Sequence, residues 1–283
     1  MPINGQTEIV GIIGDPIHHT KSPVIHNAAF EALGKNCAYV PFHVRPDDVE
    51  SAIAGIWALG IRGVNVTVPH KQSVIPFLDE LSADAREIGA VNTIVNHEGT
   101  LIGHNTDAPG FVKSLQDDHQ FTCKGKRVSI IGAGGSARAI AIGLKRAGIS
   151  HLSLINRTKA TAAELAQTVA DGQFVPDCFE PDSSDAVATL ANSDLIVQTT
   201  SVGMSPNNQA TPVTDFSWVR SGQLVIDIIY SPETTLFLST CAKNGAKIGN
   251  GAGMLIAQAA LAFELFTNTA APIPVMRKAF YEQ

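Results

Sequence analysis

One stretch of the sequence combines a β-strand pattern with side chains that can move protons. In Gly63–Lys71, GVNVTVPHK, the polar Asn65 and Thr67 alternate with valines, so one face of the predicted strand packs while the other presents hydrogen-bonding groups. Pro69 cannot donate to a β-ladder, so we expect the strand to end there and to leave Lys71 at the mouth of a turn. Taken alone, the stretch also fits an edge strand with a solvated lysine.

Three further stretches carry comparable side chains. Thr20 and Ser22, in HHTKSPVIHN, precede a predicted helix and offer two hydroxyls suited to a carboxylate, together with the N–H groups of the helix start. Asn92 lies in the otherwise apolar AVNTI, and Asp107 follows in GHNTDAPGF. Hydroxyls and aspartate are also common helix caps, and asparagine is common in turns. Taken singly, each residue leaves a structural and a functional interpretation open.

A glycine-rich segment points to a bound dinucleotide. IIGAGGSARA places Gly132, Gly134 and Ala137 in a G-x-G-x-x-A pattern between a predicted strand and a predicted helix. The first glycine allows a tight turn, the second lets the backbone approach a pyrophosphate, and the small third residue permits close packing of strand and helix. A plain βα turn would show the same letters, but the flanking strand and helix favour the dinucleotide.

The end of the following predicted strand indicates which dinucleotide. An NAD-selective site usually has an acidic residue there for the ribose 2′-hydroxyl, whereas INRT has Asn156 and Arg157. Arginine pairs with a 2′-phosphate through its planar guanidinium group, and Lys159 adds a second positive charge. A solvated Arg157 is the alternative; otherwise the pattern favours NADP over NAD.

The composition restricts the class of protein. The chain has 283 residues, enough for roughly two domains. Its net charge of −6, without a run of lysine or arginine, argues against a nucleic-acid-binding surface. The four cysteines form no CxxC pair, which argues against a zinc ribbon and suits reduced thiols. Because we find neither a secretory signal pattern nor a membrane-spanning segment, we expect a cytoplasmic protein.

Short β-rich runs alternate with longer alanine- and leucine-rich stretches, the pattern of a parallel sheet covered by helices. Strands, some running into loops, are predicted at 8–14, 37–44, 63–68, 127–135, 151–158, 193–204 and 223–230, with a hairpin at 90–105. Helices are predicted at 22–34, 46–60, 79–89, 136–148, 159–170 and 251–266. We expect the last helix to return to the first domain.

In this order and over nearly the whole chain, the stretches resemble the shikimate dehydrogenase family, including its quinate/shikimate dehydrogenase members. The stretches that carry the resemblance are GDPIHHTKSPVIHN, NVTVPHK, GAVNTI, NTDAPGF, GAGGSARA, NRT, TTSVGM, DIIYSPETT and GMLIAQAALAFEL. The resemblance implies NADP-linked interconversion of 3-dehydroshikimate and shikimate. It also implies a two-domain α/β fold, with an α/β substrate domain at 1–107 completed by helices at 250–283, and a Rossmann-type doubly wound NADP domain at 108–249.

The resemblance assigns roles to individual residues. Lys71 matches the catalytic lysine of the family and Asp107 its partner aspartate. The matching substrate-binding residues are Thr20, Ser22, Asn65, Thr67, Asn92, Asp107, Tyr230 and Gln258. The matching cofactor-binding residues are Gly132, Ala133, Gly134, Gly135, Ser136, Asn156, Arg157, Thr158, Lys159, Thr200, Met204, Ile228, Gly251, Gly253 and Met254.

Three positions depart from the family pattern. Thr20 replaces the usual serine and adds a methyl group where the substrate carboxylate is expected. A basic residue that often follows the NRT arginine is missing, since Thr161 and Ala162 stand there, and Phe266 replaces a common tryptophan. The first departure affects the identity of the substrate and the second the strictness of NADP selectivity.

These departures leave alternatives open. The chain could act on quinate or another small ring acid, or it could be a non-catalytic NADP-binding regulatory protein on the same scaffold. We expect a small-molecule substrate, no nucleic-acid or membrane partner, and a monomer or homodimer. His18, His19 and His26 have the spacing of no standard ligand set, so we expect no metal.

Overall fold

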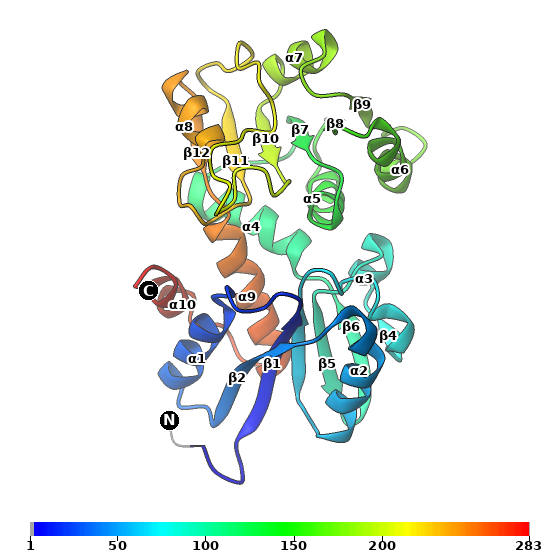
Figure 1. Ribbon diagram of the computed structural model, residues 1–283, viewed down its shortest axis with the longest axis vertical. Coiled ribbons are helices and arrows are strands. Elements are labelled where there is room, and N and C mark those ends of the chain that lie inside the picture. The colour runs from blue at the N-terminus through cyan, green and yellow to red at the C-terminus, as the bar shows by residue number, and fades with distance from the viewer. Residues whose placement is uncertain (1–2, 283) are drawn as a thin grey trace. The chain divides into compact units, whose positions relative to one another are not determined.

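The computed structural model describes residues 3–282 (Figure 1), which form two compact units. Unit 1 comprises the residues up to Gly110 and those from Ile256 on, and unit 2 comprises Phe111–Leu255. The chain passes between the units within two helices, α4 (Asp107–His119) and α9 (Ala252–Thr267). The domain limits expected from the sequence, after 107 and before 250, stay predictions. No helix among the described residues is long and apolar enough to cross a membrane.

Unit 1 contains a mixed six-stranded sheet in the order β2-β1-β3-β5-β6-β4. Its strands are β1 (Glu8–Gly14), β2 (Cys37–His43), β3 (Gly63–Val66), β4 (Glu80–Leu81), β5 (Thr93–His97) and β6 (Thr100–His104). β1 pairs in parallel with β2 and β3, whereas β5 is antiparallel to both β3 and β6. The hairpin predicted at 90–105 is confirmed, with Glu98 and Gly99 at positive φ in its turn.

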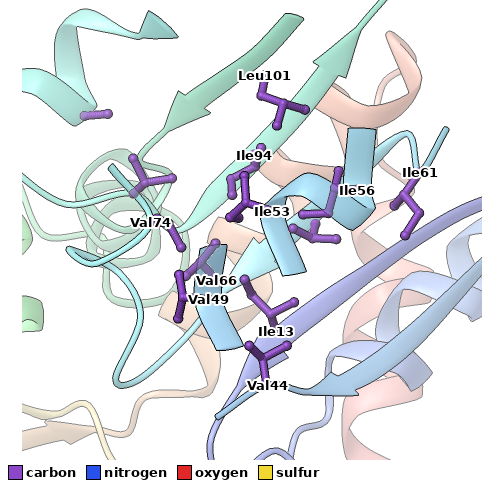
Figure 2. Packing of buried hydrophobic residues seen from close by; sticks show 13 residues of the cluster. Ile13, Val44, Val49, Ile53, Ile56, Ile61, Val66, Val74, Ile94 and Leu101 are labelled. Carbon is purple, nitrogen blue, oxygen red and sulfur yellow. The ribbon is translucent and has the colours of Figure 1, made fainter. Parts of the chain in front are cut away.

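The helices of unit 1 connect these strands or follow them. They are α1 (Ser22–Ala32), α2 (Val49–Ala58), α3 (Ala83–Ile88), α10 (Ile273–Tyr281) and the 3₁₀ turns η1 (Pro46–Asp48) and η2 (Ile75–Phe77). On α2, Val49, Ile53 and Ile56 are buried at the spacing of one helix face. Figure 2 shows this face packed over apolar side chains of the sheet, including Val66 and Ile94.

β3 is shorter than the sequence predicts. It ends at Val66, so Thr67 and Val68 belong to the following turn and not to the strand. Val64 and Val66 are buried, but Val68 is 67% exposed, so the expectation that the three valines share one packed face is wrong for Val68. The physical reason is that the chain turns before Pro69, with the N–H of His70 bonded to the carbonyl of Thr67 at 2.9 Å.

Unit 2 contains a fully parallel six-stranded sheet in the order β12-β11-β10-β7-β8-β9. Its strands are β7 (Arg127–Ile131), β8 (His151–Ile155), β9 (Asp177–Phe179), β10 (Leu195–Gln198), β11 (Leu224–Asp227) and β12 (Lys247–Gly249). Counted along the chain, this is the 3-2-1-4-5-6 order of a doubly wound dinucleotide-binding fold. The order reverses between β7 and β10, and ligands of such folds bind beyond the carboxyl ends of the strands at that point.

Helices α5 (Gly135–Arg146), α6 (Lys159–Val169), α7 (Ser184–Ala191) and α8 (Leu236–Lys243) connect the strands of unit 2. The sequence patterns predict α5 and α6 but miss β9, β12, α7 and α8. Three-residue strands and eight-residue helices carry too few residues to show a period. α7 and α8 nevertheless bury Leu190 and Phe237 in one apolar cluster with Trp218.

Candidate active site and cofactor loops

Lys71 and Asp107 form an ion pair in unit 1. Lys71 lies in the turn that follows β3, and its Nζ is 2.6 Å from Oδ2 of Asp107. Asp107 is the first residue of α4, but Asn105 caps this helix, since its Oδ1 accepts hydrogen bonds from the N–H groups of Asp107 and Ala108. The carboxylate of Asp107 is therefore not used as a helix cap and is available to hold the ammonium group of Lys71.

Asn92 orients the other oxygen of this carboxylate. Its Nδ2 donates to Oδ1 of Asp107 at 3.0 Å and to Oγ1 of Thr106 at 2.9 Å. The backbone N–H of Thr106 donates in return to Oδ1 of Asn92 at 2.8 Å, which fixes the amide in this orientation. Oε1 of Gln258, from α9, lies 3.4 Å from the same Nδ2. The structure thus brings together four of the residues singled out from the sequence: Lys71, Asn92, Asp107 and Gln258.

Asn65 continues the network along the sheet. Its Nδ2 donates to the carbonyl of Asn92 at 3.2 Å and to Oγ1 of Thr93 at 3.0 Å, and its Oδ1 accepts from the hydroxyl of Tyr39 at 2.7 Å. Burial raises the pKa of Tyr39 well above its usual value, while a hydrogen bond with Ser22 lowers it, so Tyr39 remains a neutral donor. Through Tyr39, the network extends from Lys71 to Ser22.

Thr20 and Ser22 lie at the other end of this network. Their hydroxyl oxygens are 3.2 Å apart at the start of α1. Between them, Lys21 points elsewhere: its Nζ donates to the carbonyl of Phe280 in α10 at 3.2 Å. Thr67 is half-buried and lies just past the end of β3. Its methyl group packs close to Gly14, where an added Cβ would collide with it.

Sequence reasoning missed two members of the network, Tyr39 and Thr93. Both lie in strands and are buried, so in the sequence they resemble ordinary sheet residues.

His26, considered above as a metal ligand, stacks on Tyr39 with ring centroids 4.3 Å apart. Burial lowers the pKa of His26 to about 3, so this ring is a neutral core residue. Among residues 3–282, no three His, Cys, Asp or Glu side chains converge as a metal site would require.

The glycine-rich turn of unit 2 has the shape that a phosphate group needs. Gly132 has φ of +112°, and a Cβ there would lie 3.0 Å from Cγ2 of Thr200 and even closer to Thr199. Gly134 caps α5, and Cβ atoms added at Gly134 or Gly135 would meet no atom within 4 Å. The first glycine is thus required by the fold, and the next two leave open space in front of the helix N-terminus, where Ala133 and Ser136 also lie.

The segment after β8 presents positive charge to solvent. Asn156 is anchored, with its N–H bonded to the carbonyl of Phe179 and its Nδ2 to the carbonyl of Thr158. Arg157, Thr158 and Lys159 are exposed. Family members often have a further basic residue at position 161 or 162. In this chain Thr161 is exposed and Ala162 is fully buried. These residues fit a 2′-phosphate, with Arg157 and Lys159 as its cations.

The remaining predicted cofactor residues follow other strands of unit 2. Met204 is 48% exposed after β10, and Ile228 and Gly251 follow β11 and β12. A Cβ at Gly251 would collide with the backbone carbonyl of Ile228, so this position requires glycine, whereas one at Gly253 would meet the end of the Asp118 side chain. Met254 lies in α9.

Tyr230 is the one predicted substrate-binding residue that belongs to unit 2, since the others all belong to unit 1. Burial raises the pKa of its hydroxyl. Its contact with substrate stays a prediction.

Comparisons with known proteins match most of the chain to domains of one family. Residues 12–94 match the shikimate dehydrogenase substrate-binding domain, residues 114–229 the shikimate/quinate 5-dehydrogenase domain, and residues 251–279 the shikimate 5′-dehydrogenase C-terminal domain. A shikimate dehydrogenase (NADP(+)) from Desulforamulus reducens is 45% identical over 99% of this chain and 97% of its own length.

Solved structures of shikimate and quinate dehydrogenases have the same fold as this chain. A shikimate dehydrogenase in complex with NADP+ superimposes with a TM-score of 0.92 at 38% identity, covering 99% of this chain and 97% of the other. The quinate dehydrogenase of Corynebacterium glutamicum in complex with NAD superimposes with a TM-score of 0.89 at 29% identity, covering 98% and 99% of the two chains.

Proposed function

The chain belongs to the shikimate dehydrogenase family, and on that premise we propose that it is an oxidoreductase that interconverts 3-dehydroshikimate and shikimate with NADP. The observation that carries this proposal is the Lys71–Asp107 pair at 2.6 Å, which Asn92 holds from the other side. A regulatory protein that only bound NADP would have no use for this partly buried acid–base pair. The carboxylate of Asp107 holds and directs the Nζ of Lys71, as the positioning of a proton donor to a ketone requires.

The chemistry divides between the cofactor and the protein. NADPH supplies the hydride that reduces the ketone carbon. The carbonyl oxygen then gains an electron pair and takes a proton from the ammonium group of Lys71. In the opposite direction, neutral Lys71 accepts the proton of the ring hydroxyl as the hydride leaves. Asp107 accepts hydrogen bonds from Lys71 and Asn92.

We assign the substrate contacts by the same chemistry. The hydroxyls of Thr20 and Ser22, at the start of α1, donate to the substrate carboxylate. Asn65, Asn92 and Gln258 hold the ring hydroxyls, with Thr67 beside them. In unit 2, the turn at Gly132–Gly135 holds the pyrophosphate of NADP, and Arg157 and Lys159 bind its 2′-phosphate.

The partner we propose is therefore a small ring acid, and we propose that the protein acts as a monomer or homodimer in the cytoplasm. Cys37, Cys123, Cys178 and Cys241 are free thiols, which suits a reducing compartment.

The test is the initial rate of shikimate and quinate oxidation, each with NADP and with NAD, for the purified protein and for Lys71→Ala. We expect shikimate with NADP to be the fastest pair and the substitution to lower kcat by roughly 10²- to 10⁴-fold. Lys113→Ala is the matched control, because Lys113 forms an exposed ion pair with Asp117 at 2.8 Å. Its kcat should stay within about twofold of wild type, as expected for a surface pair.

Two results would contradict the proposal. Equal loss of activity in Lys71→Ala and Lys113→Ala would mean that Lys71 has no special role. Faster turnover of quinate than of shikimate would favour quinate as the substrate. This alternative follows from Thr20, whose methyl group departs from the usual serine.

A further inference from the structure

Asp227 is a fully buried carboxylate that the proposed reaction does not use. It ends β11 and lies opposite Gln198, the last residue of β10, in the register of the parallel sheet. Gln198 and Thr235, which follows in the next loop, are also fully buried. A buried charge is costly unless hydrogen bonds compensate it, so the donors around Asp227 indicate what it holds in place.

Those donors come from two loops. Oδ1 of Asp227 accepts from the N–H of Ile229 at 3.0 Å and from Nε2 of Gln198 at 3.4 Å. Oδ2 accepts from Oγ1 of Thr235 at 2.7 Å. One carboxylate therefore ties both ends of the loop 228–235 to the last residue of β10.

Gln198 extends this connection to the loop after β10. Its Nε2 donates to the carbonyls of Thr200 and Val202, both at 3.1 Å, and its Oε1 accepts from the N–H of Thr200. The side chain of Gln198 thus fixes the turn at 199–202, and Asp227 fixes Gln198.

Two further loops touch the same assembly. Thr200 lies close to Gly132: a Cβ added at Gly132 would be 3.0 Å from Cγ2 of Thr200. The N–H of Gly251 donates to the carbonyl of Ile229 at 3.1 Å. The loops after β7, β10, β11 and β12 are therefore linked to Asp227 directly or through one or two neighbouring residues. They carry the predicted cofactor residues Gly132, Thr200, Ile228 and Gly251.

We propose that Asp227 is a positioning residue for the cofactor, which through Gln198 and Thr235 holds these four loops in the arrangement that binds NADP. The inference rests on the proposed function in one respect, namely that the ligand of unit 2 is NADP. It goes beyond that function because the hydrogen-bond partners of Asp227 described above, Gln198, Ile229 and Thr235, have no part in the proton transfer or the substrate contacts proposed there.

The charge state of Asp227 matters for this role. Burial raises its pKa to about 6, against the hydrogen bonds from Ile229, Thr235 and Gln198, which lower it. The elements beside β11 bring little competing charge. β10 presents the neutral Gln198, and α8 presents Cys241, whose pKa burial and the charge of Asp227 raise to about 12. β12 carries Lys247 opposite Leu224, at the far end of the strand.

Asp227 is thus ionised above about pH 6 and protonated below it. An ionised acceptor makes stronger hydrogen bonds than a neutral one, so the loops are held more firmly in the ionised state.

The experiment compares Asp227→Ala and Asp227→Asn by direct titration with NADP. Alanine removes all three hydrogen bonds. Asparagine can keep them, because its oxygen accepts from Ile229 and Gln198 while its NH₂ group donates to the hydroxyl of Thr235, which accepts as well as donates. We expect Asp227→Ala to raise the Kd for NADP at least about tenfold at pH 8, and Asp227→Asn about threefold.

Asp194→Ala is the matched control. Asp194 also anchors a loop of unit 2, with Oδ2 accepting from the N–H of Arg127 at 2.9 Å, but it precedes β10 and so lies at the amino ends of the strands. Its Kd for NADP should stay within about twofold of wild type. A folded Asp227→Ala that binds NADP as Asp194→Ala does would overturn the proposal.

A pH series decides the question even if Asp227→Ala does not fold. The 2′-phosphate of NADP titrates in the same range, so the quantity to follow is the ratio of Kd between Asp227→Asn and wild type. We expect this ratio to be near one at pH 5 and to rise through about pH 6 to its value at pH 8. A ratio that is flat or falls with pH would overturn the proposal.

The binding readout separates this inference from the proposed function. A wild-type protein that binds NADP but does not oxidise shikimate would contradict the proposed function alone. One that binds no NADP would contradict both.

Discussion

The candidate sites of the two units are built in opposite ways. In unit 1 the candidate residues are buried side chains that already bond one another, from Ser22 through Tyr39 and Asn65 to Asp107. In unit 2 the glycine-rich turn offers backbone groups and open space, with exposed basic side chains one strand away. A fixed side-chain network suits the recognition of one ring acid, whereas backbone N–H groups and surface charge suit a pyrophosphate and a 2′-phosphate.

Among the variants that compare the two units, the largest effect is expected from Asp107→Asn in the network of unit 1. Both oxygens of Asp107 accept hydrogen bonds, from Lys71 and from Asn92, so an amide in either orientation would place its NH₂ group against a donor. Asn92 cannot turn its amide to compensate, because its Oδ1 holds the N–H of Thr106. We expect kcat for shikimate oxidation to fall by about 100-fold while the Kd for NADP stays unchanged.

Asp117→Asn, in the exposed pair with Lys113, is the control for steady-state kinetics and NADP titration. A kcat for Asp107→Asn within threefold of the control would show that the network does not need a carboxylate here. Since Asp227→Asn should be mild, the two Asp→Asn changes also compare the two units directly.

A pair of glycine substitutions tests the open turn of unit 2. Gly132→Ala places a Cβ at φ of +112° and against Thr200, so we expect a loss of about 1–3 kcal/mol in the free energy of unfolding. Gly134→Ala has φ of −84° and free space around the Cβ, so stability should change little. Its Cβ would instead occupy the space where the pyrophosphate approaches, and we expect NADP binding to weaken about tenfold or more.

Thermal unfolding and NADP titration of the two variants measure these effects. Equal destabilisation by both, or unchanged NADP binding in Gly134→Ala, would refute the view that the two glycines have different tasks.

Arg157→Ala tests the exposed charge of unit 2. Loss of the guanidinium group should raise the KM for NADP by about tenfold and leave the KM for NAD nearly unchanged, because only NADP carries the 2′-phosphate. Arg127→Ala, an exposed arginine at the start of β7, is the control. An equal change for both cofactors would place Arg157 outside the 2′-phosphate site.

The smallest effect is expected from Tyr39→Phe, which removes one hydroxyl from the network of unit 1. Asn65 loses the donor to its Oδ1, so we expect a cost of about 1 kcal/mol in stability and a rise of about threefold in the KM for shikimate. The KM for NADP should not change. Tyr281→Phe, at an exposed tyrosine of α10, is the control. A rise in the KM for both ligands would show that Tyr39 acts on the fold as a whole.

The sequence predicts the candidate site of unit 2 better than that of unit 1, and the reason is physical. The turn at Gly132 is a local structure, in which strand, glycines and helix are consecutive, so letter spacing alone predicts it. The elements around it with weak periodicity, such as β9 and α8, were not predicted. In unit 1 the residue types of Lys71, Asn92 and Asp107 indicate chemistry, but each residue taken singly also has a structural explanation, and only the family resemblance favours the functional one.

Local patterns in the sequence determined most strands and helices, the glycine-rich turn, the lack of an acidic residue after β8, and the residue types available for proton transfer. Tertiary structure alone decided that Asn105 caps α4 in place of Asp107, that Tyr39 and Thr93 join the network, and that Val68 is exposed. It also decided that Asp227 is fully buried among neutral donors. These outcomes depend on which distant strands become neighbours, as Lys71 and Asp107 do across 36 positions of the chain, and no local period encodes that.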